Sequence, residues 1–424
     1  DKERFIAAIN ARWDVTDFLY VRGRIGGDRY TVSKQNSTPW GTAYQMKGSM
    51  AESEDTYRQY DADMFIGTDN LQLVDGVSLT AFVGMGTNNQ KYEAYRVSGS
   101  DFIVPFLINV GNTKNQGHGY NIWEKQINSA YGSAEIGFMD YVYLTVTARN
   151  DWFSTLSQKD KVAPNNDLYT SASVSLVVSD ALDLGETISF LKLRGGVSQV
   201  AGGANNPYAL SLSYGIYGQG HLGASLGNIS GGTIPNSEIT PFEKNETEFG
   251  MDLRLFDNKL SIDATFYDNE TLGDIVGVSA SATSGYGSAL ANLGNISNKG
   301  IELLIKGTLI QTEDFAWNAS INYTNNTSKV VATNDAGGNI SMAEPRSRNL
   351  RVTHIVGEKY GALYGSSFVR DASGSIVHEM VNGIPIPKVG DRKILGFGVA
   401  PTQLGIGTSF RYKDFNGSLL FDGK

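Results

Sequence analysis

An alternation of apolar and polar residues dominates the middle of the chain, at residues 246–323. In 249–255 every second residue is apolar: Phe249, Met251, Leu253 and Leu255. The alternation returns directly after the Asp257-Asn258 corner, and again in 301–309 and 315–323. A period of two residues is typical of β-strands with one apolar face, and not of helices. These residues therefore predict two consecutive β-hairpins.

Short corners and long polar connections alternate along the whole chain. The corners are rich in Asp, Asn and Gly, which turns prefer; they lie at 14–17, 68–76, 139–140, 179–186, 257–258, 312–314 and 413–414. The connections span 29–44, 98–121, 151–168, 201–242, 269–296 and 326–402. Seven corners with a strand on either side predict fourteen strands in an all-β, antiparallel, up-and-down arrangement.

The sorting of loops by length indicates whether these strands lie in a membrane or in a soluble protein. Short turns at one end and long loops at the other are typical of outer-membrane β-barrels, whereas a soluble sandwich would not sort its loops this way. Aromatic residues near the short corners would form the girdle at the periplasmic interface: Trp13, Phe18, Tyr20, Phe138, Tyr141, Phe256, Phe315, Phe410, Tyr412 and Phe415. The pattern favours a transmembrane barrel over a large soluble β protein whose core holds these aromatics.

The polar face of the central strands would then line a water-filled lumen. Its residues are Glu246, Glu248, Asp252, Arg254, Asp263, Glu302, Lys306, Asn318 and Asn322. Asp61 and Asp63 fall on one strand face, so we interpret them as lumen residues and not as a metal or acid pair.

Composition excludes several other classes of protein. The 424 residues include no cysteine, which removes disulfides and thiol chemistry. The formal net charge is −9, without the basic patch of a nucleic-acid-binding protein. No apolar run reaches the roughly 18–20 residues of a membrane-spanning helix.

We find no motif for catalysis, for a cofactor or for a metal. The four histidines lie far apart in the sequence, in predicted loops and without zinc-ligand spacing: His118, His221, His354 and His378. Nucleophile-elbow, Walker A and dinucleotide-binding patterns are also absent from the sequence. The sequence therefore predicts no enzyme.

Candidate substrate-binding residues lie at the loop end of the strands. Loops on a rigid scaffold often bind ligands, and aromatic faces beside amides suit a glycan or a peptide. The candidates are Arg149, Asp151, Trp152, Tyr208, Tyr214, Tyr217 and Tyr364. The loop aromatics are equally able to pack against a covering protein or one another, and Asp151 is able simply to anchor its loop.

Several segments, in order along nearly the whole chain, resemble the SusC/RagA group of TonB-dependent outer-membrane transporters from Bacteroidetes-type bacteria. Residues 298–303 (NKGIEL) resemble a strand opening of that group, and 148–156 (ARNDWFSTL) resemble its strand-to-loop segment. Residues 191–200 (LKLRGGVSQV) and the hairpin at 243–267 match two further patterns. In 356–365 the loop pattern is kept, except that Lys359 stands where proline is usual.

The resemblance implies a 22-stranded barrel with an N-terminal plug domain and a TonB-box peptide. Nothing ahead of Asp1 resembles a plug, and Lys424 lies in a strand without a terminal aromatic. We therefore expect residues 1–424 to be a barrel segment with long extracellular loops, with the plug domain and C-terminal strands outside it.

The resemblance also implies import across the bacterial outer membrane. A SusD-like lipoprotein would cover the mouth, and TonB would act through the N-terminal part of the polypeptide. Lipid and lipopolysaccharide would surround the wall, and the ligand would be a nutrient oligomer, either an oligosaccharide or a peptide. The alternative is a passive pore or a structural outer-membrane component, and a surface enzyme is disfavoured.

Overall fold

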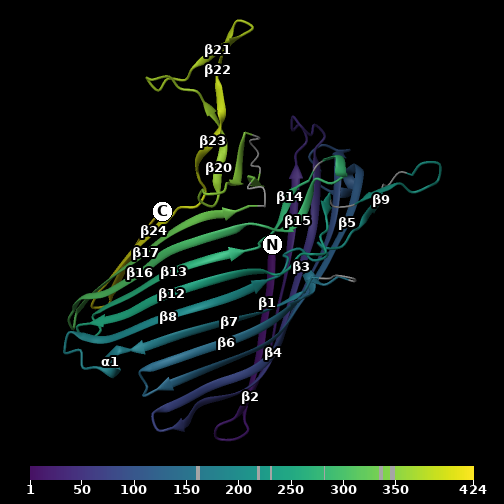
Figure 1. Cartoon of the computed structure of the whole chain (residues 1–424). Coiled ribbons are helices and arrows are strands. Elements are labelled where there is room, and N and C mark those ends of the chain that lie inside the picture. The colour runs from purple at the N-terminus through teal and green to yellow at the C-terminus, as the bar shows by residue number, and fades with distance from the viewer. Residues whose placement is uncertain (159–162, 217–219, 230–231, 281, 334–337, 344–348) are drawn as a thin grey trace.

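The computed structural model describes residues 1–158, 163–216, 220–229, 232–280, 282–333, 338–343 and 349–424. One antiparallel sheet of fourteen strands contains most of them, and its strands follow one another in chain order. Figure 1 shows this sheet as a curved wall, with the short corners at its lower end and the elements of the long loops at its upper end.

The strands of the wall differ greatly in length. They are β1 (Lys2–Asp14), β2 (Tyr20–Thr38), β3 (Ser49–Val74), β4 (Val77–Phe102), β5 (Thr113–Phe138), β6 (Val142–Phe153), β7 (Asn166–Val177), β8 (Ile188–Gly202), β12 (Phe242–Leu255), β13 (Leu260–Leu272), β16 (Asn295–Gln311), β17 (Phe315–Ala332), β24 (Thr402–Tyr412) and β25 (Phe415–Gly423). One short helix, α1 (Val178–Ala181), lies in the corner between β7 and β8.

The prediction of fourteen strands is confirmed, because each predicted corner joins two neighbouring strands of the wall. Local backbone chemistry explains several corners. Phe256, Asp257 and Asn258 all have a positive φ, a conformation that Asp and Asn tolerate better than most residues. In the predicted corner at 68–76 the turn itself is only Asp75-Gly76, and β3 reaches Val74 through two register shifts.

The predicted connections at 29–44 and 98–121 are wrong in their bounds, since most of their residues are in strands. Only 39–48 and 103–112 connect β2 to β3 and β4 to β5. Beyond the membrane both faces of a strand meet water, so the apolar alternation that marks a strand fades there although the hydrogen-bond ladder continues. The four longest neighbouring strands thus form an extension above the rest of the wall.

Three further connections carry small sheets, one of which is shared between two of them (Figure 1). Between β8 and β12 lie β9 (Tyr214–Ile216), β10 (Gly227–Ile229) and β11 (Thr233–Ile234); between β13 and β16 lie β14 (Ile275–Ser279) and β15 (Ser288–Asn292). Between β17 and β24 lie β18 (Ile340–Ala343), β19 (Leu350–His354), β20 (Ala362–Phe368), β21 (His378–Val381), β22 (Ile384–Pro387) and β23 (Val389–Phe397). Among the described residues no helix has the length and apolar character needed to cross a membrane.

Strand register separates the two faces of the wall. Leu253 lies opposite Leu191 and Ile262, and the same row continues through Ile305, Ile321, Ile406 and Phe421. The row that passes through Gly250 is polar instead, and consists of Arg194, Thr265, Glu302, Thr324 and Gln403. One face is therefore apolar and the other polar over the second half of the sheet, as the alternation predicts.

The apolar face has the height of a lipid bilayer. On β4 its apolar residues run from Val77 to Met85, and the next outward residues, Thr87 and Asn89, are polar. At ~3.3 Å per residue, and with the usual barrel tilt of ~40°, this stretch spans roughly 20 Å of the membrane normal, close to the ~25 Å apolar band of outer-membrane barrels.

Tyr20 corrects the predicted girdle, because it lies on the polar face and is 7% exposed. Its ring meets the ring of Phe65 edge-on at 6.2 Å, and Phe65 and Tyr131 flank Phe82 at 5.3 and 6.2 Å. The girdle prediction used only the position of Tyr20 near a corner, whereas Tyr20 alternates with Val21 and belongs to a cluster of four aromatic residues on the inner side.

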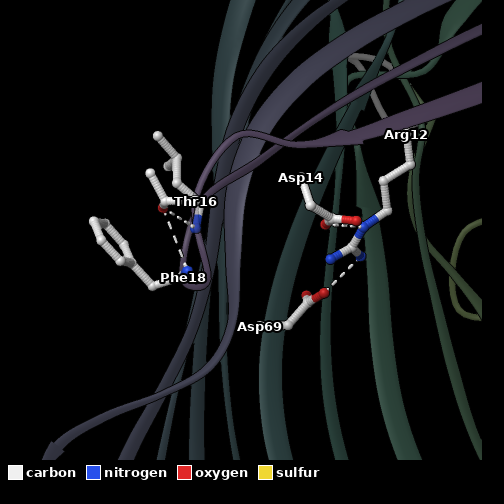
Figure 2. A network of polar contacts seen from close by, with 6 residues as sticks. Arg12, Asp14, Thr16, Phe18 and Asp69 are labelled. Carbon is white, nitrogen blue, oxygen red and sulfur yellow. Dashed lines mark hydrogen bonds and ion pairs between the residues drawn. The ribbon is translucent and has the colours of Figure 1, made fainter.

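The corner between β1 and β2 is tied to β3 by charge (Figure 2). Arg12 donates to Asp14 at 2.8 Å and to Asp69 at 2.6 Å. The Thr16 hydroxyl accepts hydrogen bonds from the Phe18 and Leu19 amides at 3.4 and 3.1 Å, which closes the turn. Because the Arg12 and Asp14 side chains are 45% and 64% exposed, water screens this pair strongly and we expect it to contribute little stability.

Candidate functional site

The candidate site is the polar inner face of the wall together with its upper rim. All nine predicted lumen residues of the central strands share this face, as their cross-strand partners demonstrate: Glu248 faces Tyr267, Asp252 faces Asp263, and Lys306 faces Ser320. The prediction of a polar face is confirmed for these strands. A surface of this kind suits a water-filled passage, because a polar side chain facing lipid would lose its hydrogen bonds with water.

Arg194 of β8 organises one charged group on the inner face. Its guanidinium donates to Asp263 at 3.0 Å and to the Thr265 hydroxyl at 2.6 Å, and lies 3.6 Å from Glu248. These carboxylates are about two-fifths exposed, so they remain accessible to water. The group contains two carboxylates and one guanidinium, so this part of the inner face has a net negative charge.

A second polar network crosses β5, β6 and β7. Arg149 donates through Nε to Asp151 at 2.8 Å and through a terminal nitrogen to Ser129 at 2.7 Å. The Tyr169 hydroxyl donates to the same carboxylate at 2.6 Å. Asp151 is 6% exposed, so its charge is buried and satisfied by these donors.

The network continues into the first strands through an aromatic bridge. The Arg149 guanidinium lies 5.2 Å from the centre of the Tyr131 ring, and the Tyr131 hydroxyl donates to Asp63 at 3.2 Å. Arg24 donates to the other oxygen of Asp63 at 2.7 Å. The interpretation of Asp63 as an inner-face residue therefore agrees with its position, and it takes part in a network of ion pairs and hydrogen bonds.

We expect Asp151→Ala to destabilise β6 and β7 by about 1–3 kcal/mol, because it leaves the Tyr169 hydroxyl and part of Arg149 without an acceptor. Asp151→Asn keeps a neutral acceptor and is expected to cost less. Urea unfolding of the protein in phospholipid vesicles measures both. Asp14→Ala, at an exposed pair, is the control; equal losses for Asp14→Ala and Asp151→Ala would contradict the structural role assigned to Asp151.

The structure separates the candidate residues of the loop end. Arg149 and Asp151 lie together on the inner face, but Trp152 lies on the outer face, in a hollow lined also by Met64, Met85 and Ala130. Adjacent residues of a strand point to opposite faces, so Trp152 is not able to share a ligand with Asp151. The position of Trp152 therefore argues against its candidacy as a substrate-binding residue.

The four tyrosine candidates lie in different loops. Tyr208 is 60% exposed, and its hydroxyl accepts from the Glu124 amide at 3.2 Å. Tyr364 is half-buried in β20 and lies opposite Arg351. Tyr214 begins β9, where only the backbone is described, and Tyr217 lies outside the described residues. These positions do not bring the four side chains into one site.

Sequence reasoning missed an aromatic row on the inner side of the extension. Tyr30 lies opposite Tyr57, Tyr57 opposite Tyr92, and Tyr92 opposite Trp123. The first and last pairs of this row are stacked, with ring centres 5.0 Å apart for Tyr30–Tyr57 and 5.5 Å apart for Tyr92–Trp123. A row of amides lies just below, where Gln59 donates to Asp61 at 2.9 Å. The spacing of Tyr92 and Ala94 on one face of β4 is a period-two signal that falls just ahead of the predicted connection at 98–121.

The histidines form no common site. His354 is buried beside the Tyr360 ring at 4.7 Å, and burial lowers the pKa of His354 below its usual range. Within the part of the chain that the structure describes, no three His, Cys, Asp or Glu side chains are grouped to hold a metal ion.

An apolar band of bilayer height, a polar inner face and long loops at one rim define a large β-barrel of the bacterial outer membrane. Residues 1–398 match the family described as TonB dependent receptor-like, beta-barrel. The chain belongs to this family, which is one of receptors and not of enzymes.

Curated relatives agree with this assignment. TonB-dependent receptor P3 of Formosa agariphila is 24% identical over 70% of this chain and 32% of its own length. TonB-dependent receptor SusC of Bacteroides thetaiotaomicron is 26% identical over 42% of this chain and 19% of its own length. The chain therefore spans about a third of the first of these relatives, and the resemblance to SusC-type receptors is confirmed.

Solved structures share the fold. The RagAB peptide transporter superimposes with a TM-score of 0.80 at 16% identity, over 99% of this chain and 48% of the other. The siderophore receptor PiuA from Acinetobacter baumannii gives a TM-score of 0.53 at 14% identity, over 99% and 60%. At this level of identity the likeness concerns the fold of the wall alone.

Proposed function

We propose that this chain forms part of the wall of an outer-membrane importer for a nutrient oligomer, either a glycan or a peptide. The polar inner face of the central strands carries the proposal, because it provides a water-lined route through the membrane. The names of the relatives support a TonB-energised mechanism. The RagAB peptide importer, which shares the fold, supports the direction of transport.

The rest of the barrel, its plug and its partner proteins are also proposed. An open fourteen-stranded sheet would leave two unpaired edges in lipid, which supports the proposal that further strands close it. We propose a 22-stranded barrel, of which residues 1–424 are a segment, with a plug inside on which TonB pulls. A SusD-like lipoprotein would cover the upper rim, where the exposed loop strands β21 and β22 project (Figure 1).

Uptake of labelled oligomers by cells tests the proposal. Cells that carry the protein are expected to accumulate labelled peptides or oligosaccharides, and a protonophore is expected to abolish accumulation because TonB draws on the inner-membrane proton gradient. A passive pore would instead conduct ions in a planar bilayer and remain insensitive to the protonophore. That result would replace import with the pore alternative.

Introduced cysteines test the water-lined wall independently, because the chain has none of its own. Ser173→Cys on the inner face is expected to react with a water-soluble maleimide. Val174→Cys, the next residue and on the outer face, is expected to be protected by lipid. Equal labelling of the two cysteines would refute the assignment of faces.

A further inference from the structure

β5 has a free edge at the upper rim. It pairs with β4 along nearly its whole length, from Thr113↔Phe102 to Phe138↔Val77. On its other side β6 pairs only from Ile127 downward, because β6 ends at Phe153. Residues 113–126 of β5 therefore have no neighbouring strand on that side, although they keep the extended backbone of a sheet.

Hydrogen bonds at the lower part of this edge fix the direction of its amides. The Gln126 amide donates to the Ser154 hydroxyl at 2.7 Å, and the Glu124 amide donates to the Tyr208 hydroxyl at 3.2 Å. Both partners lie on the side away from β4. Because the register has no shift here, every second residue above them presents its amide and carbonyl on the same side.

The next three such residues are His118, Tyr120 and Ile122. Among the described residues, nothing accepts from or donates to the outward backbone groups of His118, Tyr120 and Ile122. Natural proteins usually blunt a strand edge with proline, a bulge or a covering segment. Residues 114–126 contain no proline and show no bulge, so this edge is a ready template for another strand.

The side chains on the two faces of the edge leave an added strand unobstructed. On the inner face Gly117 and Gly119 have no side chain that would crowd a neighbouring strand. On the outer face Tyr120 is 55% exposed, and its ring lies 4.9 Å from the Tyr95 ring. Two hollows at this height, of about 520 and 790 Å³, lie over β2 to β5 and not beside the free edge.

We propose that the edge at His118–Ile122 binds extended peptide cargo by strand addition. Main-chain hydrogen bonds would supply affinity without requiring one sequence, and the peptide's alternate side chains would lie beside the Gly117 and Gly119 face and beside Tyr120. A glycan has no regular ladder of amides to pair with this edge, so the geometry favours a peptide. The inference rests on the proposed import function and names the substrate class.

The test uses the purified protein in lipid nanodiscs, with a capped octapeptide of alternating Thr and Val as probe and maltoheptaose as comparison. The octapeptide is expected to slow hydrogen exchange at the His118, Tyr120 and Ile122 amides at least about tenfold, because they gain acceptors. Maltoheptaose is expected to leave them unchanged. Amides already protected before addition, or protected equally by maltoheptaose, would overturn the proposal.

Two variants of one residue separate the backbone from the side chain. Tyr120→Pro removes an outward amide that β4 does not use, and is expected to weaken octapeptide binding about tenfold. Tyr120→Thr keeps the amide and is expected to bind nearly as well. Exchange protection at Arg96 and Ala94 of β4 verifies that the β4–β5 hairpin stays folded. Equal binding by both variants, or equal loss in both, would overturn strand addition.

The two proposals fail separately, because this binding needs neither TonB nor an energised membrane. Peptide pairing without protonophore-sensitive uptake would refute import alone. Protonophore-sensitive uptake of oligosaccharides without pairing at β5 would refute the peptide edge alone.

Discussion

Leu253→Arg is expected to lower the stability of the folded wall by about 2–4 kcal/mol if the residue lies near the middle of the bilayer. Leu253 lies in the apolar row between Leu191 and Ile262, so the new guanidinium would point into lipid. Its charge would lose hydration there without gaining a partner. The free energy of unfolding in phospholipid vesicles, from urea titration, measures the effect.

Ser173→Arg is the matched control, because Ser173 lies on the polar face opposite Gly196 and Thr145. An arginine at this position keeps contact with water, so we expect a much smaller loss than for Leu253→Arg. If Leu253→Arg assembled with unchanged stability, the assignment of the outer and inner faces would be wrong.

Leu156→Ala is expected to destabilise the loops above β6 and β8 by about 2–5 kcal/mol, the usual range for a leucine deleted from a packed core. Leu156 is fully buried in a small cluster with Phe153, Leu210 and Ile239. This cluster joins the loop after β6 to the long loop between β8 and β12. Hydrogen exchange of these loop amides measures the loss locally.

Leu222→Ala gives the comparison within the same long loop. Leu222 is 94% exposed, so its truncation leaves no cavity and is expected to change exchange very little. Similar effects of the two substitutions would mean that the cluster does not hold the loops together. A loss confined to Leu156→Ala would show that a true apolar core supports the rim.

Much of the wall is predictable because a membrane imposes a simple rule on each strand. A lipid-facing residue must be apolar and its neighbours face water, so 249–255 and 260–266 reveal both their strands and their faces. The same rule stops working above the bilayer. Above the bilayer the apolar alternation is lost, and strands continue into segments predicted as loops: β2 runs to Thr38, β4 runs to Phe102, and β5 begins at Thr113.

The candidate site was predicted only in part, for a related reason. Arg149 and Asp151 are two residues apart on one strand, so they lie on the same face, and their side chains form an ion pair. Trp152 lies on the other face, as the same alternation implies. It was chosen as a candidate because of its position near the loop, without regard to its face. The aromatic row of Tyr30, Tyr57 and Trp123 joins strands that are far apart in sequence, so only their register reveals it.

The sequence by itself determined the strand count, the corners, the two faces and the family, because each depends on residues close together in the chain. Only the tertiary structure shows which strands extend farther than the strands beside them. The upper edge of β5 is free only because β6 stops at Phe153, and no local pattern near His118 or Tyr120 records where another strand ends. Edges, hollows and cross-strand networks depend on long-range pairing, and a one-dimensional pattern does not encode that pairing.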